Sequence, residues 1–306
     1  MNRRNFLTIA GVSAAPRARA ATEPSTIIDT HAHFYDPSRP GGVPWPPKED
    51  STLYRTVLPA DFRRIAAPLG VKGVIKVEAS PLLEDNQWVL DLAAKEPVIV
   101  GVVGNVEPGK PDFGRHLERF RRDKKFLGIR CGNLWGRNFA ADSAKPEFKS
   151  DLKLLADAGL EMDAVGGPAM VPNLVRVTDR VPALRIVIDH MPFAVPQDQS
   201  VRAAYQEALR EIGTRKQVYC KVSSVLRRSD GRVPQDMAYY RPALDELWAV
   251  FGDSRLIYGS NWPVSERIAP YSVVFKVVQD YFTAKGQQAV DKYFWQNAKT
   301  AYRWNA

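Results

Sequence analysis

Histidines are the residues of this chain whose number and spacing point most directly to chemistry. The 306 residues include four of them, His31, His33, His116 and His190. His31 and His33 are two positions apart in a predicted strand, so both imidazoles should point to the same side. His190 ends another predicted strand, whereas His116 lies in a predicted helix. Neutral imidazoles directed at one point are ligands that zinc and similar divalent ions prefer. We therefore predict a zinc or manganese site at His31, His33 and His190.

Other side chains are candidates for contacts with a substrate or with these histidines. Arg130 ends a predicted strand, where a guanidinium can hold a substrate carboxylate with two parallel hydrogen bonds. An ion pair with Asp163 on the adjoining strand is the alternative. Lys221 points inward near another strand end, either toward the substrate or into a buried ion pair. Trp45 is a candidate pocket wall, although tryptophans are as often plain packing. Asp29 points inward by strand alternation and could orient a ligand histidine; a hydrogen-bonded partner at the base of the barrel is the alternative.

The elements that must position these residues follow a repeating pattern. Short, almost continuously apolar runs alternate with amphipathic stretches, as expected for parallel strands covered on both faces. The predicted strands are 26–33, 71–79, 98–106, 126–132, 160–165, 185–190, 218–223 and 256–261. Such βα units close into a single-domain (β/α)₈ TIM barrel. A doubly wound nucleotide-binding sheet is the competing fold, but the first predicted strand is not followed by its glycine-rich turn.

Barrel enzymes build their active sites at the C-terminal ends of the strands. Three of the four histidines fall at such ends. The long connection at 35–58, rich in proline and glycine, follows the first predicted strand on the same face. Long connections without their own secondary structure are commonly functional. We expect this one to be a lid or a pocket wall.

The first 20 residues are predicted to be a twin-arginine signal peptide. Arg3 and Arg4 precede a short, weakly apolar stretch, and Ala18-Arg19-Ala20 is a small-residue cleavage site. The domain would then comprise residues 21–306 and act in the periplasm after export. No other segment is apolar and long enough to cross a membrane. We expect no membrane partner.

Charge and cysteine usage narrow the function further. The net charge of +9 includes the arginines of the predicted signal segment, and most other basic residues are interleaved with acids. Such runs are usually solvated helix faces, so we expect no nucleic-acid partner. Cys131 and Cys220 are the two cysteines, and both lie in predicted strands on different sides of the barrel. We expect two reduced, mostly buried thiols.

Several segments, in this order, resemble the amidohydrolase-related family that includes sugar lactonases. They cover nearly all of the predicted domain and comprise 28–37 (IDTHAHFYDP), 101–104 (GVVG), 128–130 (GIR), 186–192 (IVIDHMP), 218–223 (VYCKVS), 258–264 (YGSNWPV) and 293–298 (YFWQNA). The resemblance implies a (β/α)₈ hydrolase that opens lactones. It also implies that the paired histidines and the later one line the metal or substrate site, and that Asp163 faces the substrate. A loop-capping role is the alternative for Asp163.

One position departs from the family pattern. The family's Gly-Ser-Asp-Trp-Pro motif carries an aspartate that activates water, and this chain has Asn261 there. An amide cannot accept a water proton at neutral pH. Three explanations are open: Glu78 acts as the base, a metal-free histidine does, or hydrolysis is lost. The alternative role of Glu78 is that of a surface partner for a lysine.

The predicted function is hydrolysis of a lactone or similar cyclic ester, from an anionic or sugar-derived small molecule. The bound metal would polarise the carbonyl and lower the pKa of a water. The predicted catalytic residues are His31, His33, His190, Glu78 and Asn261, and the predicted substrate contacts are Arg130, Asp163, Trp45 and Lys221. Decarboxylation, as in a related barrel subfamily, and non-catalytic binding of sugar acids are the alternatives.

Overall fold

The computed structural model describes residues 23–304, so the predicted signal peptide lies outside the described residues. Eight parallel strands pair in chain order within that range. They are β1 (Ile27–Ala32), β2 (Val71–Val77), β3 (Ile99–Gly104), β4 (Phe126–Gly132), β5 (Glu161–Val165), β6 (Arg185–Met191), β7 (Val218–Val222) and β8 (Leu256–Tyr258). Each coincides with a predicted strand, and β8 ends at Tyr258, three residues before its predicted end at 261.

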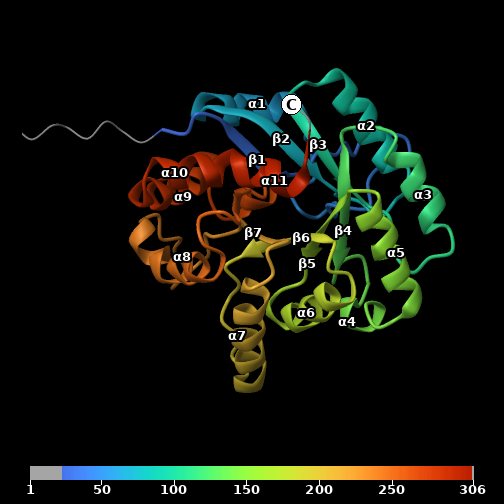
Figure 1. Ribbon diagram of the computed structural model, residues 1–306. Helices are drawn as coiled ribbons and strands as arrows, with labels where there is room; N and C mark the ends of the chain where they lie inside the picture. The colour runs from blue at the N-terminus through green and yellow to red at the C-terminus, as the bar shows by residue number, and fades with distance from the viewer. Residues whose placement is uncertain (1–22, 305–306) are drawn as a thin grey trace, which may run out of the picture.

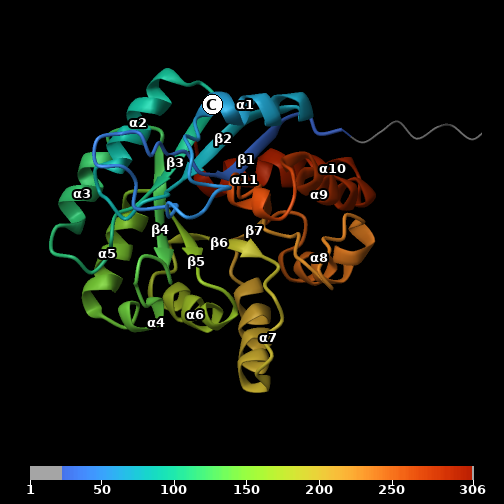
Figure 2. The ribbon, with the colours of Figure 1, turned by 180° about the vertical axis from the view of Figure 1, so that it is seen from behind.

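Helices surround the strands, as Figures 1 and 2 show from opposite sides. They are α1 (Pro59–Ala66), α2 (Asp85–Lys95), α3 (Phe113–Phe120), α4 (Phe139–Asp142), α5 (Pro146–Asp157), α6 (Val171–Arg180), α7 (Gln199–Gly213), α8 (Met237–Phe251), α9 (Tyr271–Lys285), α10 (Gln287–Asp291) and α11 (Asn297–Tyr302). Helices follow the strands on the outside of the sheet, which is the arrangement of a (β/α)₈ barrel.

The sheet closes through the residues that follow β8. The backbone N–H of His33 donates to the carbonyl of Trp262, and the N–H of Asn261 donates to the carbonyl of His31, each over 2.8 Å. Ala32 and Trp262 form a parallel bridge. The first and last strands therefore meet, and the predicted TIM barrel is confirmed.

Apolar side chains pack on both sides of the sheet. The larger cluster lies between the strands and the helices. A smaller cluster joins interior positions such as Ile75, Val103 and Val187 to Ala301 and Tyr302 of α11. Ala301 also accepts a hydrogen bond from Arg185, the first residue of β6, so this helix covers the end of the barrel opposite the strand C-termini.

Two further predictions concern buried thiols and the long connection. Cys131 and Cys220 are free and buried, as expected. The connection at 35–58 contains one bridge, Tyr35 with Val57, and no helix or strand. Within residues 23–304, none of the helices has the length and apolar character needed to cross a membrane.

Candidate active site

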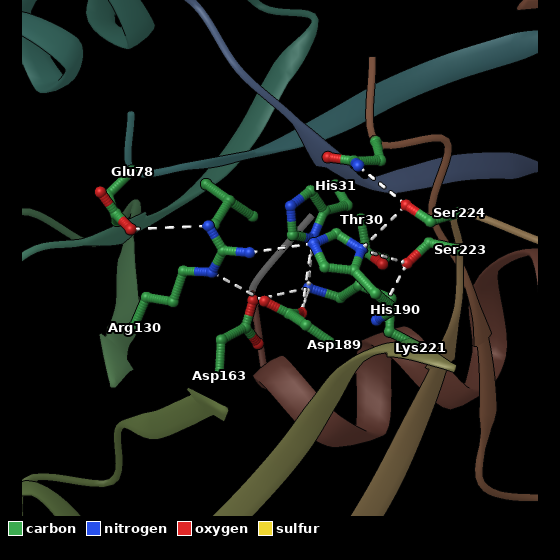
Figure 3. Close-up of polar contacts among 12 residues, drawn as sticks. Thr30, His31, Glu78, Arg130, Asp163, Asp189, His190, Lys221, Ser223 and Ser224 are labelled. Atoms are coloured by element: carbon green, nitrogen blue, oxygen red, sulfur yellow. Dashed lines mark hydrogen bonds and ion pairs between the residues drawn. The ribbon is translucent and has the colours of Figure 1, made fainter. Parts of the chain in front are cut away.

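Polar side chains from several strands meet at the C-terminal end of the barrel (Figure 3). Glu78 follows β2, Arg130 lies on β4, Asp189 and His190 lie on β6, and Lys221 lies on β7. Because all the strands are parallel, their C-terminal ends open on one face. The topology therefore brings together side chains that are up to 228 positions apart in the sequence, as for His33 and Asn261.

The three predicted site histidines lie against one another. The ring centroids of His31 and His33 are 5.0 Å apart, and those of His31 and His190 are 4.5 Å apart. His31 is fully buried, and its Nε2 has no hydrogen-bond partner among residues 23–304. Its Nδ1 lies 3.3 Å from Nζ of Lys221 and 3.4 Å from Oδ1 of Asp189. Burial holds the pKa of His31 well below its ordinary value, so the ring is neutral.

Asp189 and His190 are adjacent on β6, yet both side chains reach the site. Successive strand residues normally point to opposite faces, but His190 has a φ of 61°, in the left-handed region. Its Nε2 lies 3.0 Å from Arg130 and its Nδ1 lies 2.9 Å from Oγ of Ser223. A guanidinium only donates, so Nε2 accepts and the protonated Nδ1 donates to Ser223. Sequence reasoning missed Asp189, because simple alternation places it opposite His190.

Left-handed backbone conformations gather around this site. Trp135, Ser224 and Asn261 have φ angles of 58°, 51° and 57°, beside the 61° of His190. Each such position costs about 1–3 kcal/mol and persists only where surrounding contacts hold it. The strained positions therefore indicate that side chains at this end of the barrel are held in particular directions, as is typical of a functional site.

Arg130 is held by two partners on either side. Its Nε donates to Oδ2 of Asp189 over 2.8 Å, and its Nη1 lies 3.5 Å from Oε1 of Glu78. The alternative partner predicted from sequence, Asp163, does not contact it. Nη1 makes no other polar contact among residues 23–304, so the N–H group that does not face Glu78 is available to a substrate.

Lys221 and Asp163 lie beneath the cavity rather than on its wall. Both are completely buried. Nζ of Lys221 donates to Oδ2 of Asp163 over 2.5 Å and lies 3.0 Å from Oδ1 of Asp189. Tyr302 donates to the other Asp163 oxygen over 2.8 Å. The substrate contacts predicted for Lys221 and Asp163 do not fit these positions, because the two side chains pair with each other and with the buried Asp189 and Tyr302.

Asp189 is the carboxylate that contacts both Arg130 and Lys221. Burial alone would raise its pKa, but Lys221, His31 and Arg130 together hold it well below the ordinary value. Asp189 is therefore ionised, and it fixes the positions of both cations. By contrast, burial and the nearby charge of Asp189 raise the pKa of Asp163 to about 6.

Glu78 has one oxygen anchored and one free. Its Oε2 accepts hydrogen bonds from the Ser80 N–H and from Nε1 of Trp135, both over 3.1 Å. Its Oε1 has no hydrogen-bond partner among residues 23–304. Burial raises the pKa of Glu78 above its ordinary value. A fixed carboxylate of this kind is suited to accept a proton.

His33 and Asn261 contact each other. Nδ1 of His33 lies 3.1 Å from the carbonyl oxygens of Val77 and Glu78, so it must donate to them. Its Nε2 lies 3.2 Å from Oδ1 of Asn261, and with the proton on Nδ1 both of these atoms are acceptors. The Asn261 nitrogen donates to Oγ of Ser224 over 2.8 Å. Burial, together with the charges of Arg130 and Lys76, lowers the pKa of His33 to about 3.

A cavity of about 280 Å³ opens above these groups. Its lining comprises His33, Trp45, Glu78, Ala79, Arg130, Leu134, Trp135, Val165, His190, Asn261, Val264 and Arg267. Trp45 belongs to the long connection, and its ring lies 5.8 Å from that of His33. This connection thus forms a wall of the pocket.

Asp29 does not orient a histidine ring, so the first of its two predicted roles is wrong, and it serves as a hydrogen-bonded partner instead. Its oxygens accept from the backbone N–H groups of His31 and Ser260 and from the hydroxyl of Tyr271, over 2.9–3.0 Å. The register between β1 and β2 shifts between Asp29 and Ala32. This bulge breaks the alternation on which the prediction depended, and Asp29 instead joins β1 to the β8 end and to α9.

One group in the described part of the chain has the side chains to hold a metal ion. It consists of His31, Asp189 and His190, whose candidate ligand atoms lie within 4.8 Å of one another. Asp189 takes the place of the predicted His33. Imidazole and carboxylate donors suit zinc or manganese. Nε2 of His31, which has no hydrogen-bond partner among residues 23–304, is a further argument for a metal ligand at this position.

The remaining donors of this group are already paired with cations. Arg130 contacts Oδ2 of Asp189 and Nε2 of His190, and Lys221 contacts Oδ1 of Asp189. Two unit charges 4 Å apart repel by about 4 kcal/mol at an effective dielectric constant of 20. A divalent ion on the same atoms would therefore have to displace both side-chain cations. As arranged, the group fits Arg130 and Lys221 and does not fit a divalent ion.

Most of the chain matches one known protein family. Residues 28–304 match the family described as amidohydrolase. The chain belongs to this family. Membership agrees with the barrel, with the histidine pair after β1 and with the Asp-His pair on β6, and it makes the protein a hydrolase.

Two curated relatives and one solved structure resemble this amidohydrolase over most of its length. An L-fucono-1,5-lactonase from Burkholderia ambifaria is 33% identical, over 78% of this chain and 80% of the relative. An L-fucono-1,5-lactonase from Burkholderia multivorans is 25% identical, over 88% and 92%. A zinc-bound crystal structure of an amidohydrolase from Burkholderia multivorans is 23% identical, with a TM-score of 0.80, over 92% and 100%. At that identity the structural likeness supports the fold alone.

Proposed function

We propose that this amidohydrolase opens the ring of a lactone by hydrolysis, with Glu78 as the general base and Arg130 as the group that stabilises the carbonyl oxygen. The observation that carries the proposal is the pair formed by Oε1 of Glu78, which accepts no hydrogen bond among residues 23–304, and Nη1 of Arg130, 3.5 Å away, with both residues lining the same cavity. The names of both curated relatives support lactone opening over decarboxylation and over non-catalytic binding.

The reaction needs a base, a place for negative charge and a proton for the leaving oxygen. Oε1 of Glu78 takes a proton from water as the water oxygen attacks the lactone carbonyl carbon. The carbonyl oxygen gains negative charge, which the Nη1 group of Arg130 stabilises. The ring C–O bond then breaks, and the protonated Glu78 returns its proton to the leaving oxygen. The product is a hydroxy acid, which releases its carboxyl proton to solvent.

The histidines are poor candidates for the base. Burial lowers the pKa of His190, like that of His33, to about 3, so both rings stay neutral and accept protons weakly. The pKa of Glu78 is shifted in the opposite direction, toward the working pH. A base is most effective when its pKa lies near that pH. Of the three explanations for Asn261, these contacts favour Glu78 as the replacement base.

A panel of lactones tests the proposal. Ring opening releases acid, so a pH-stat can follow it without a coloured substrate. We expect the mature protein to open at least one five- or six-membered lactone faster than its own Glu78→Gln variant. Carbon dioxide release from aromatic acids, without lactone turnover, would instead select decarboxylation.

Metal removal provides an independent prediction. Because the metal-capable donors are paired with Arg130 and Lys221, a chelator should change kcat/KM by less than about twofold, unlike an enzyme whose metal is required. The measurement is lactone hydrolysis before and after dialysis against a chelator, with metal content determined on the same samples. Loss of activity together with loss of stoichiometric zinc or manganese, and recovery when that ion is returned, would show that the protein needs a metal, for which His31, Asp189 and His190 are the candidate ligands.

Gly259 provides a prediction about the position of His31. A Cβ at position 259 would lie 2.9 Å from Cβ of His31 and 3.1 Å from Cγ of Lys221. We expect Gly259→Ala to displace the imidazole and lower kcat by about 10- to 100-fold, because small misplacements are costly in catalysis. Steady-state kinetics and thermal melts check this. Gly114→Ala on α3, where the nearest contact is 3.8 Å away, is the matched control and should leave kcat unchanged.

We also propose that the protein works after twin-arginine export. The support is the Arg3-Arg4 pair followed by the small-residue site at Ala18-Arg19-Ala20. Cell fractionation of the full chain should place a shortened protein in the periplasm. Replacing Arg3 and Arg4 with lysine should leave the unprocessed chain in the cytoplasm, whereas an unchanged distribution would refute export by this route.

A further inference from the structure

The wall of the active-site cavity differs in character from its floor. The floor is polar and carries the groups discussed above. The wall is formed by Trp45, Leu134, Trp135, Val165 and Val264. Among the lining residues within 23–304, Arg267 is the single charged side chain outside the floor. The cavity therefore presents reacting groups on one side and a mostly apolar surface on the other.

The polar atoms near this wall are already occupied. Nε1 of Trp135 donates to Glu78. The Arg267 guanidinium pairs with Asp50, and its side chain is 43% exposed at the rim. The Trp135 donor is therefore occupied, and Arg267, whose Nη2 pairs with Asp50, lies at the rim rather than deep in the cavity.

The polar floor is also largely paired. His33 contacts Asn261, and Asn261 contacts Ser224. His190 contacts Arg130 and Ser223. What remains is the pair of Glu78 and Arg130, which the hydrolysis of any lactone requires, and Nε2 of His33, which can only accept because Nδ1 carries the proton. The hydroxyls of a sugar lactone would therefore have few partners, and each one buried without a partner weakens binding by about tenfold or more.

The size of the cavity suits a ring with an apolar substituent. Its volume is about 280 Å³, whereas an apolar cavity of about 150 Å³ is known to accept benzene. Each methylene that leaves water for such a wall strengthens binding by about fourfold. The tryptophan rings provide flat surfaces for an aryl or alkyl group.

We propose that the substrate is a lactone whose ring carries an alkyl or aryl portion, which packs against Trp45, Leu134 and Val165, rather than a polyhydroxylated sugar lactone. The inference rests on the lactone-opening function proposed above. It assigns substrate choice to the apolar wall and the chemistry to Glu78 and Arg130.

Turnover of matched substrates tests this inference. Mature enzyme is assayed with δ-valerolactone, δ-decalactone, dihydrocoumarin and D-glucono-1,5-lactone, and each kcat/KM is divided by the uncatalysed rate constant. We expect this ratio for δ-decalactone and for dihydrocoumarin to exceed that for the sugar lactone by at least about 100-fold. Two or more unpartnered hydroxyls, each weakening binding about tenfold, multiply to a difference of this size. A preference for the sugar lactone would overturn the inference while leaving lactone hydrolysis in place.

A wall variant shows whether the preference arises in this cavity. Leu134→Asn should lower kcat/KM for δ-decalactone by about tenfold, but change that for δ-valerolactone by less than about twofold, because only the longer substrate reaches the wall. Leu154→Asn on α5, at a leucine that is 48% exposed, is the matched control and should alter neither. Equal losses on both substrates with Leu134→Asn would contradict the assignment of specificity to the wall.

A binding readout separates this inference from the proposed function. Tryptophan fluorescence should change on titration with 4-butylcyclohexanone, an apolar cyclic ketone without an ester bond, and the change should weaken in Leu134→Asn. If no lactone is opened but the ketone binds, lactone hydrolysis fails and the apolar character of the site stands. If a polyhydroxylated cyclohexanone binds more tightly than the butyl ketone, the inference fails whatever the turnover result.

Discussion

Replacing Glu78 with glutamine is expected to lower kcat for lactone hydrolysis by about 10²–10⁴-fold, the usual contribution of a positioned general base. The substitution keeps the size and shape of the side chain, and its amide oxygen can still accept from Ser80 and Trp135. It removes the capacity of Oε1 to take a proton from water. KM should change little, because the anchoring contacts stay in place and the cavity keeps its shape.

The pH dependence should identify the same group. Burial raises the pKa of Glu78 above its ordinary value of 4.5. A base works only when deprotonated, so kcat/KM should be constant at high pH and fall as the pH drops through this raised pKa. The acid limb should therefore have its midpoint above 4.5 and disappear in Glu78→Gln. The neutral rings of His33 and His190, with pKa values of about 3, should add no limb near the ordinary histidine value of 6.5.

Two controls make the Glu78 experiment decisive. Glu84→Gln removes an exposed carboxylate whose partner is Arg119, and it should leave kcat unchanged. Asn261→Asp restores the carboxylate of the family pattern beside His33. If Asn261→Asp raises the activity of Glu78→Gln to the wild-type level, the position after β8 can host the base. If Glu78→Gln is as active as wild type, Glu78 is not the base.

The fold and the meeting of the histidines could be predicted from the sequence because both follow from simple periodicities. Buried parallel strands read as short apolar runs, and a ring of such strands brings all the C-terminal ends to one face. His31, His33 and His190 sit at those ends, so their convergence needs no knowledge of distances. Trp45 was placed on the pocket side for a similar reason, because the connection after β1 begins on that face.

The depth and pairing of the other site residues could not be predicted, because they depend on local departures from strand geometry. The bulge in β1 turns Asp29 away from the histidines. The left-handed conformation of His190 lets Asp189 share the site with it. Lys221 and Asp163 have site-like residue types, yet they lie one layer below the cavity. An Asp next to a strand-end His, as in Asp189-His190, is the signal that would have pointed to the missing carboxylate.

Replacing Arg130 with lysine is expected to lower kcat/KM by about 10²–10³-fold, the typical loss when a donor to a developing oxyanion is removed. Lysine keeps the positive charge that Asp189 requires, so the buried carboxylate is not left unpaired. It cannot reach Asp189, His190 and the substrate oxygen together, because an ammonium lacks the planar, forked geometry of a guanidinium. The expected signature is a loss mainly in kcat, since the interaction is strongest with the negative charge of the transition state.

Arg130→Met separates catalysis from folding. It leaves Asp189 with Lys221 as its remaining cation, and breaking a buried pair typically costs about 3–5 kcal/mol. We therefore expect Arg130→Met to lower the Tm clearly, whereas Arg130→Lys should lower it much less. Arg119→Lys, at an exposed arginine that pairs with Glu84, is the matched control for the chemistry of the substitution and should alter neither quantity. A folded Arg130→Lys protein with wild-type kcat would show that the oxyanion is stabilised elsewhere.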